Sequence, residues 1–350
     1  MILVFTASLV TLLAFHSADA IVPAIYVFGD STADVGNNNY LSANAQKANF
    51  PPNGIDFPGR VPTGRFCNGY IGIDYLAQLF GFIRSPPPFL SLTSFNMFEI
   101  LRGSNFASGN SGILDTTGIE IPMTQQIQYF STVRSNLTAC IGSTLTDILL
   151  SKSLFLISTG NNDLFADFAQ FGPQNDAHKN AYVAILTSKY EDHLKKLYSL
   201  GARKFGIMGI GQPGCVPILR TLTPSGECIE DLNIYGRKFN EAVKPLLNRL
   251  SSSLVGMKYS FGDSEKIVTN IQAQPSLYGL NELRNACCGG GRFNGESPCT
   301  PNATYCSNRN QYFFWDRFHP TQATYKIIVR AYFGGSLEVA SPINFRQLAF

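Results

Sequence analysis

The segment PAIYVFGDSTADVGNNN spans residues 23–39 and joins an apolar run to a cluster of small polar residues. The run at residues 23–29 is continuously apolar, which predicts a strand covered on both faces of a sheet. The chain then passes through GDST at residues 29–32, whose small side chains permit a sharp turn. We predict that this turn presents the Ser31 hydroxyl at the edge of the sheet, and a simple turn or helix cap is the alternative.

Strand-like and helix-like segments alternate along the rest of the chain. Apolar runs that predict strands lie at residues 153–159, 203–210 and 256–263. Helical patterns lie at residues 71–80, 123–133, 180–200 and 229–254, and Pro245 is expected to kink or divide the last of these. This alternation predicts a doubly wound α/β sheet, in which ligands bind at the carboxyl ends of the strands.

The composition is that of a globular protein with a sizeable core. Of 350 residues, 45% are hydrophobic and 15% are charged, which predicts a single domain over residues 21–350. Proline- and glycine-rich stretches at 51–64 and 84–90 are expected to be surface loops. The formal net charge is +3 and no run of Lys or Arg occurs, so nucleic acid is not an expected partner.

The first twenty residues resemble a targeting segment. Residues 1–20 contain no Lys or Arg, are apolar over most of their length and end in Ala18-Asp19-Ala20, a small-x-small cleavage pattern. We predict a cleaved secretory signal, with an uncleaved anchor as the alternative. No other stretch is apolar for long enough to span a membrane, so no stable membrane insertion is expected after cleavage.

Eight cysteines in a secreted chain predict disulfides. Spacing favours a bridge between Cys215 and Cys228, and two local bridges within the loop 286–306, which carries four cysteines. A zinc site is the rival interpretation, but there is no Cys-x-x-Cys and no histidine beside the cluster, so no metal is expected. Two sequons, at Asn136 and Asn302, are candidate glycosylation sites.

A serine nucleophile needs a base, and histidine is scarce in this chain. His16 lies in the signal, whereas His178 and His193 fall on polar helix faces and are expected to be solvated. His319 remains, three residues after Asp316 and just before Pro320, which is expected to open the last helix. A turn of this length lets the carboxylate hold one ring nitrogen while the other faces Ser31.

A side-chain amide follows the strand predicted at 153–159. The sequence Gly160-Asn161-Asn162-Asp163 places either asparagine at the carboxyl edge of the sheet, where its amide could stabilise a developing oxyanion. A turn that caps the next helix is the alternative.

Four ordered motifs carry a family resemblance: FGDSTADVGNNN (28–39), SNFASGNSGIL (104–114), GNND (160–163) and DRFHPT (316–321). With them the chain resembles the plant secreted esterase/lipases of the GDSL subgroup of SGNH hydrolases, from Ile25 to about residue 345. The resemblance implies a three-layer α/β/α, flavodoxin-like fold and ester hydrolysis through an acyl-enzyme without metal or organic cofactor. It implies Ser31 as nucleophile, Asp316 and His319 as acid and base, and Asn162 in the oxyanion hole.

The sequence departs from the family pattern at two positions. Thr32 stands where the motif name has leucine, with little expected effect. Asn110 occupies the position of a glycine whose N–H, together with that of Ser31, serves the oxyanion hole in the family. Any residue except proline keeps a backbone N–H and asparagine tolerates a left-handed backbone, so either Gly109 or Asn110 could donate.

These observations predict a secreted serine esterase or lipase of the apoplast or cell wall. Its substrates would be small or polymeric carboxylic esters, such as acyl lipids or cell-wall and cuticle esters. A catalytically inactive ligand- or polysaccharide-binding protein on the same fold is the alternative, and Asn110 is the feature that favours it. The sequence predicts neither the natural ester nor an oligomeric state.

Overall fold

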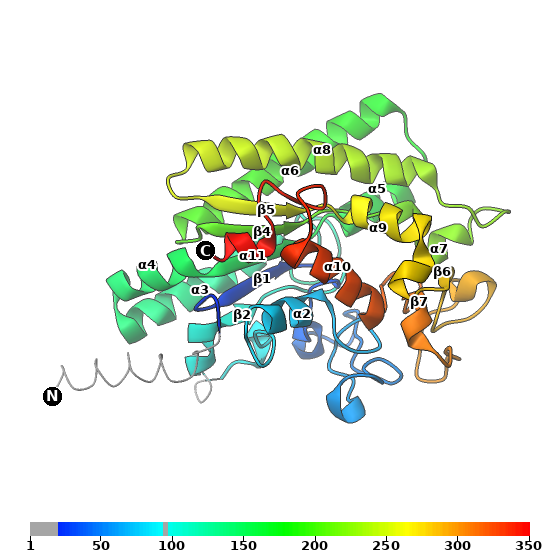
Figure 1. The fold of residues 1–350 in the computed structure, drawn as a ribbon, viewed down its shortest axis with the longest axis horizontal. Helices are drawn as coiled ribbons and strands as arrows, with labels where there is room; N and C mark the ends of the chain where they lie inside the picture. The colour runs from blue at the N-terminus through cyan, green and yellow to red at the C-terminus, as the bar shows by residue number, and fades with distance from the viewer. Residues whose placement is uncertain (1–19, 94–96) are drawn as a thin grey trace.

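The computed structural model describes residues 20–93 and 97–350 (Figure 1). Almost all of the predicted signal, residues 1–20, therefore lies outside the described residues. A six-stranded sheet has the order β2 (Gly103–Asn105), β1 (Ile25–Gly29), β3 (Leu154–Ser158), β4 (Lys204–Met208), β5 (Lys258–Gly262) and β8 (Ala340–Ser341). The first five strands are parallel and β8 is an antiparallel edge. The order 2-1-3-4-5 is that of flavodoxin-like sheets, so the predicted fold class is confirmed.

Helices cover both faces of this sheet. They are α2 (Gly72–Leu79), α3 (Met123–Ile141), α4 (Ser143–Lys152), α5 (Asn161–Phe171), α6 (Asp176–Ser199), α7 (Pro217–Arg220), α8 (Glu230–Ser253), α9 (Ser264–Ala273), α10 (Gln322–Gly334) and α11 (Phe345–Leu348). α6 packs between α3 and α8 on one face, and α10 packs with α2 and α11 on the other. None of the helices in the described residues is long and apolar enough to cross a membrane.

The strands are apolar runs because both of their faces are buried. All five residues of β1 are buried, and Tyr26 and Phe28 both contact Phe155 of β3. Phe130 of α3 closes the cluster, with its ring centroid 5.1 Å from that of Tyr26 and 5.3 Å from that of Phe155. Aromatic packing of this kind fixes the layer of helices on the sheet.

Three helices bear on the predictions made from the sequence. α8 runs without a break through Pro245, so Pro245 does not divide it, whereas a kink there stays a prediction. α10 begins two residues after Pro320, because the Thr321 hydroxyl caps it by accepting from the N–H of Thr324, and α11 follows it. α3 extends to Ile141 and contains the half-buried sequon residue Asn136, whereas Asn302 lies in an exposed turn.

Three disulfides are formed: Cys215–Cys228, Cys287–Cys306 and Cys288–Cys299. The predicted bridge at Cys215 and the two local bridges are thus present. The other two cysteines stay unpaired: Cys67 is buried, and Cys140 is exposed near the end of α3.

The bridged loop belongs to a second, small sheet. β6 (Glu282–Ala286) pairs with β7 (Tyr312–Phe314), and Cys287 and Cys288 extend this pairing. The N–H of Cys287 donates to the carbonyl of Phe314 at 3.0 Å, and that of Cys288 to Trp315 at 2.7 Å. The segment that follows β7 is therefore anchored by hydrogen bonds to two residues that are each in a disulfide.

Candidate active site

Ser31 lies two residues beyond β1, in a turn that only glycine can enter. Gly29 has a φ of +139°, and a Cβ at this position would lie 1.9 Å from the carbonyl oxygen of Ser158. The N–H of Asp30 donates to the same oxygen at 3.0 Å, which fixes the turn against β3. Ser31 is 9% exposed and lines a cavity at the carboxyl edge of the sheet.

Asp316 and His319 lie in the turn after β7. The N–H of Trp315 donates to the carbonyl of His319 at 2.7 Å and closes the turn. Asp316 Oδ1 accepts from the N–H groups of Phe318 and His319, each at 2.8 Å. Both carboxylate oxygens lie within 2.9 Å of His319 Nδ1, and Nε2 lies 2.8 Å from Ser31 Oγ.

The electrostatics of this chain favour a charged carboxylate. Burial alone would raise the pKa of Asp316, but the charge and hydrogen bonds of His319 offset it and hold that pKa below its ordinary value. An ionised Asp316 accepts the Nδ1 proton, so Nε2 keeps a lone pair directed at the Ser31 hydroxyl. The arrangement can thus transfer a proton from Ser31 to His319.

Asn162 lies in the first turn of α5 and also lines the cavity. Its Nδ2 donates to the carbonyl of Ser111 at 2.8 Å, which leaves the second amide hydrogen for a ligand. Asn161 lines the same cavity as the first residue of α5.

The two candidate backbone donors differ in what they already bind. The N–H of Gly109 donates to Asp34 Oδ2 at 3.1 Å and is therefore occupied. Asn110 has a left-handed φ of +68°, and its Nδ2 donates to Glu120 at 2.9 Å. Within the described residues, the N–H of Asn110 has no acceptor, and Asn110 lines the cavity beside Ser31.

Gln126 of α3 is a fully buried supporting residue that the sequence reasoning missed. Its Oε1 accepts from the N–H of Gly29 at 2.8 Å, and its Nε2 donates to the Gly29 carbonyl at 2.9 Å. Nε2 also lies 3.1 Å from Ser111 Oγ, so one amide joins the turn before Ser31 to the segment beneath Asn162. The available signal was a polar residue on the apolar stripe of its helix.

The other two histidines of the described residues, His178 and His193, take no part in the site, and His16 lies outside those residues. His178 lies against the Asp167 carboxylate at 3.1 Å, in a partly exposed pair. The prediction that His193 is solvated is wrong, because α6 packs between α3 and α8 and leaves this side chain 4% exposed. Its Nε2 donates to the carbonyl of Ile113 at 3.0 Å. Across residues 20–93 and 97–350, no group of three or more His, Cys, Asp or Glu side chains is placed to hold a metal.

Asp30 is buried beside Ser31, and its Oδ1 accepts from the N–H and the hydroxyl of Thr32, at 2.9 and 2.6 Å. Its Oδ2 has no hydrogen-bond partner, and burial raises the pKa of Asp30 to about 6. The folded protein therefore holds this proton to higher pH than the unfolded chain does. The resulting stabilisation is complete below about pH 4 and is lost as the pH rises through about 6.

We expect Asp30→Asn to remove the loss of stability that occurs as the pH rises through about 6. The free energy of unfolding of the variant, relative to that of the unaltered protein, should increase by about 2 kcal/mol between pH 4 and pH 7, from a pKa of about 6 against an ordinary 3.8. Urea unfolding at several pH values measures this difference, with Asp147→Asn on exposed α4 as control. A difference that stays constant with pH would refute the prediction.

Comparisons with known proteins show the family of this chain. The family model of GDSL-like lipase/acylhydrolase matches residues 25–332. One GDSL esterase/lipase of Arabidopsis thaliana is 38% identical over 341 residues, which cover 94% of this chain and 90% of that protein. Another from the same plant is 39% identical over 345 residues, covering 97% and 88%. The chain therefore belongs to the family of GDSL-like lipases and acylhydrolases, serine hydrolases that act on carboxylic esters.

Proposed function

We propose that this protein is a secreted esterase that cleaves carboxylic esters through an acyl-enzyme on Ser31. The observation that carries the proposal is the continuous hydrogen-bonded chain from Asp316 through His319 to the Ser31 hydroxyl. Ser31 and His319 are 288 residues apart in the sequence, yet each link of this chain is within 2.9 Å.

In the first half of the reaction, Ser31 Oγ attacks the ester carbonyl while its proton moves to His319 Nε2. The carbonyl oxygen becomes an oxyanion, for which the N–H groups of Ser31 and Asn110 and the free amide hydrogen of Asn162 are the donors. Collapse breaks the bond to the alcohol, which leaves with the proton from His319. Water then attacks the acyl-enzyme while His319 takes one of its protons. Collapse breaks the bond to Ser31 Oγ, which regains the proton from His319, and the acid is released.

Asn110 is the better candidate than Gly109 for the backbone donor, because the Gly109 N–H already serves Asp34. Asn110 adopts a left-handed backbone, which asparagine tolerates better than most residues. Asn110 therefore no longer favours the alternative of a catalytically inactive binding protein.

Covalent trapping tests the proposal. A fluorophosphonate ester should label the mature protein, and peptide mass spectrometry should place the adduct on Ser31. Thr32→Ala is the matched control, since Thr32 is the neighbouring hydroxyl and lines the same cavity. Labelling should persist in that variant and disappear in Ser31→Ala. Labelling that survives in Ser31→Ala would reject Ser31 as nucleophile.

We expect Asn162→Ala to lower kcat by about a hundredfold to a thousandfold, because one oxyanion donor is lost in the transition state. KM should change little, since the ground-state carbonyl carries less charge than the oxyanion. Asn161→Ala is the control at the same helix terminus and should retain most activity. If steady-state kinetics show the larger loss of kcat in Asn161→Ala, Asn161 and not Asn162 is the oxyanion donor.

Secretion is supported by three disulfides, which persist in oxidising compartments. Amino-terminal sequencing of protein purified from the extracellular fluid of plant tissue should begin at Ile21, after Ala20. A mass shift on enzymatic deglycosylation should map to Asn302, whose turn is exposed, and a start at Met1 would contradict the signal assignment.

A further inference from the structure

The cavity that contains Ser31 continues well beyond it. Its volume is about 380 Å³, and its lining includes residues at the carboxyl ends of four neighbouring strands, β1, β3, β4 and β5. The residues that mark this path are Ser31, Ser158, Met208 and Ser264. The cavity is therefore an arm that crosses the edge of the sheet, and Figure 1 shows α9 and α10 lying near that edge.

The walls of this arm are largely apolar. Val268 lines it from α9, Ile328 and Tyr332 line it from α10, and Pro213 lines it from the loop after β4. The hydroxyl of Tyr332 lies 2.5 Å from that of Ser264, so this polar atom is already satisfied. An arm with such walls is suited to a hydrocarbon chain.

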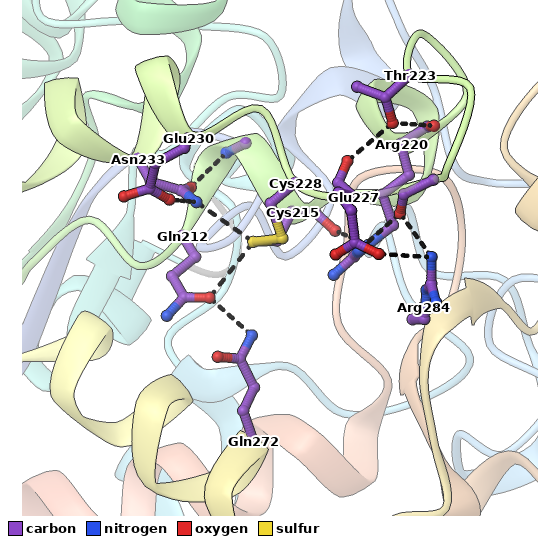
Figure 2. Close-up of a disulfide and its surroundings, with 12 residues drawn as sticks. Gln212, Cys215, Arg220, Thr223, Glu227, Cys228, Glu230, Asn233, Gln272 and Arg284 are labelled. Carbon is purple, nitrogen blue, oxygen red and sulfur yellow. Dashed lines mark hydrogen bonds and ion pairs between the residues drawn. A yellow bond between two sulfur atoms is a disulfide. The ribbon is translucent and has the colours of Figure 1, made fainter.

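A polar bridge links the loop after β4 to α9, and both of its glutamines, Gln212 and Gln272, line the arm. Gln272 Nε2 donates to Gln212 Oε1 at 2.7 Å, and Gln212 Nε2 donates to Thr269 Oγ1 at 3.3 Å. Figure 2 shows the Gln212 and Gln272 side chains directed at each other near the Cys215–Cys228 disulfide, which holds the loop in place. Gln272 is exposed, so the bridge lies on the solvent side of the apolar walls.

We propose that this arm binds the acyl chain of the ester and that the bridge between Gln212 and Gln272 limits its length. The inference rests on the proposed function, since it takes Ser31 as the point of acyl attachment. Three strand spacings of about 4.8 Å separate β1 from β5, which gives an arm of roughly 14 Å. An extended chain advances about 1.3 Å per carbon for bonds of about 1.5 Å, so the arm takes about ten to twelve carbons.

Chain-length preference follows from the apolar walls. Each methylene that enters the arm should raise kcat/KM about fourfold, the equivalent of one buried methylene group. A chain beyond the limit must break the bridge and carry carbon past two amides, so kcat/KM should fall again.

The test compares p-nitrophenyl esters of acetic, butanoic, octanoic, dodecanoic and octadecanoic acids. Val268→Trp fills the arm and should lower kcat/KM for the dodecanoate about a hundredfold, with the acetate and butanoate values within about threefold. Ile328→Phe narrows the arm from α10, and it provides a second test if Val268→Trp does not fold. Gln272→Ala should move the optimum to longer chains, whereas Gln274→Ala, an exposed neighbour beyond α9, should not.

Two results would overturn the proposal. One is an unchanged chain-length profile in a folded Val268→Trp or Ile328→Phe variant. The other is a preference that follows the alcohol, found with a series of alkyl acetates, because the arm would then hold the leaving group. Both differ from failure of the proposed function, in which Ser31→Ala would keep its activity on every ester.

Discussion

Replacement of His319 by alanine is expected to lower kcat for ester hydrolysis about a millionfold, because Ser31 loses the only base within hydrogen-bond reach among the described residues. The 2.8 Å contact between Nε2 and Oγ has no substitute in the described part of the site. Fluorophosphonate labelling of Ser31 should slow in parallel, since the same proton must leave the hydroxyl. The rates are measured with short-chain p-nitrophenyl esters, which do not depend on the acyl arm.

His178→Ala is the matched control, because it removes an imidazole that pairs with Asp167 outside the cavity. It should retain nearly full activity. Retention of more than about one hundredth of the activity by His319→Ala, in a protein with unchanged circular dichroism, would argue against proton transfer through this ring.

Asp316→Asn is expected to lower kcat about ten-thousandfold while leaving the fold intact. The amide that replaces the carboxylate can keep its oxygen on the N–H groups of Phe318 and His319, which places its NH₂ group where Oδ2 met Nδ1. An amide donor there favours the tautomer with the proton on Nε2, and that nitrogen can no longer accept from Ser31.

Two measurements separate this effect from loss of structure. The melting temperature of Asp316→Asn should stay within a few degrees of that of the unaltered protein, and KM should change far less than kcat. Asp147→Asn on exposed α4 controls for loss of one charge. Near-normal kcat in Asp316→Asn would show that the carboxylate does not set the tautomer.

The parts of the fold that sequence predicts are those with local causes. β1 and β3 are continuous apolar runs because both of their faces are covered, and this pattern needs no knowledge of the rest of the chain. The pair Asp316 and His319 is equally local, since three residues of one turn bring carboxylate and ring together. Ser31 follows from its place after the first strand.

The parts that sequence left open depend on distant contacts. The two candidate oxyanion donors, Gly109 and Asn110, are distinguished only by the hydrogen bond from the Gly109 N–H to Asp34. Asp34 lies 75 residues away in the sequence. Gln126 acts 97 residues from Gly29, and its role follows from how α3 lies on the sheet. The burial of His193 likewise depends on the packing of α6 between α3 and α8. The charged residues around His193 in the sequence do not indicate that packing.

The support of β7 has a practical consequence for anyone who produces this protein. The N–H groups of Cys287 and Cys288 donate to the carbonyls of Phe314 and Trp315, and His319, the proposed general base, follows only a few residues later. Synthesis in a thiol-rich cytosol would leave those bridges open, because glutathione keeps cysteines reduced there. Such material should carry the spectroscopic signature of an intact sheet yet hydrolyse esters poorly, until oxidative refolding restores its turnover.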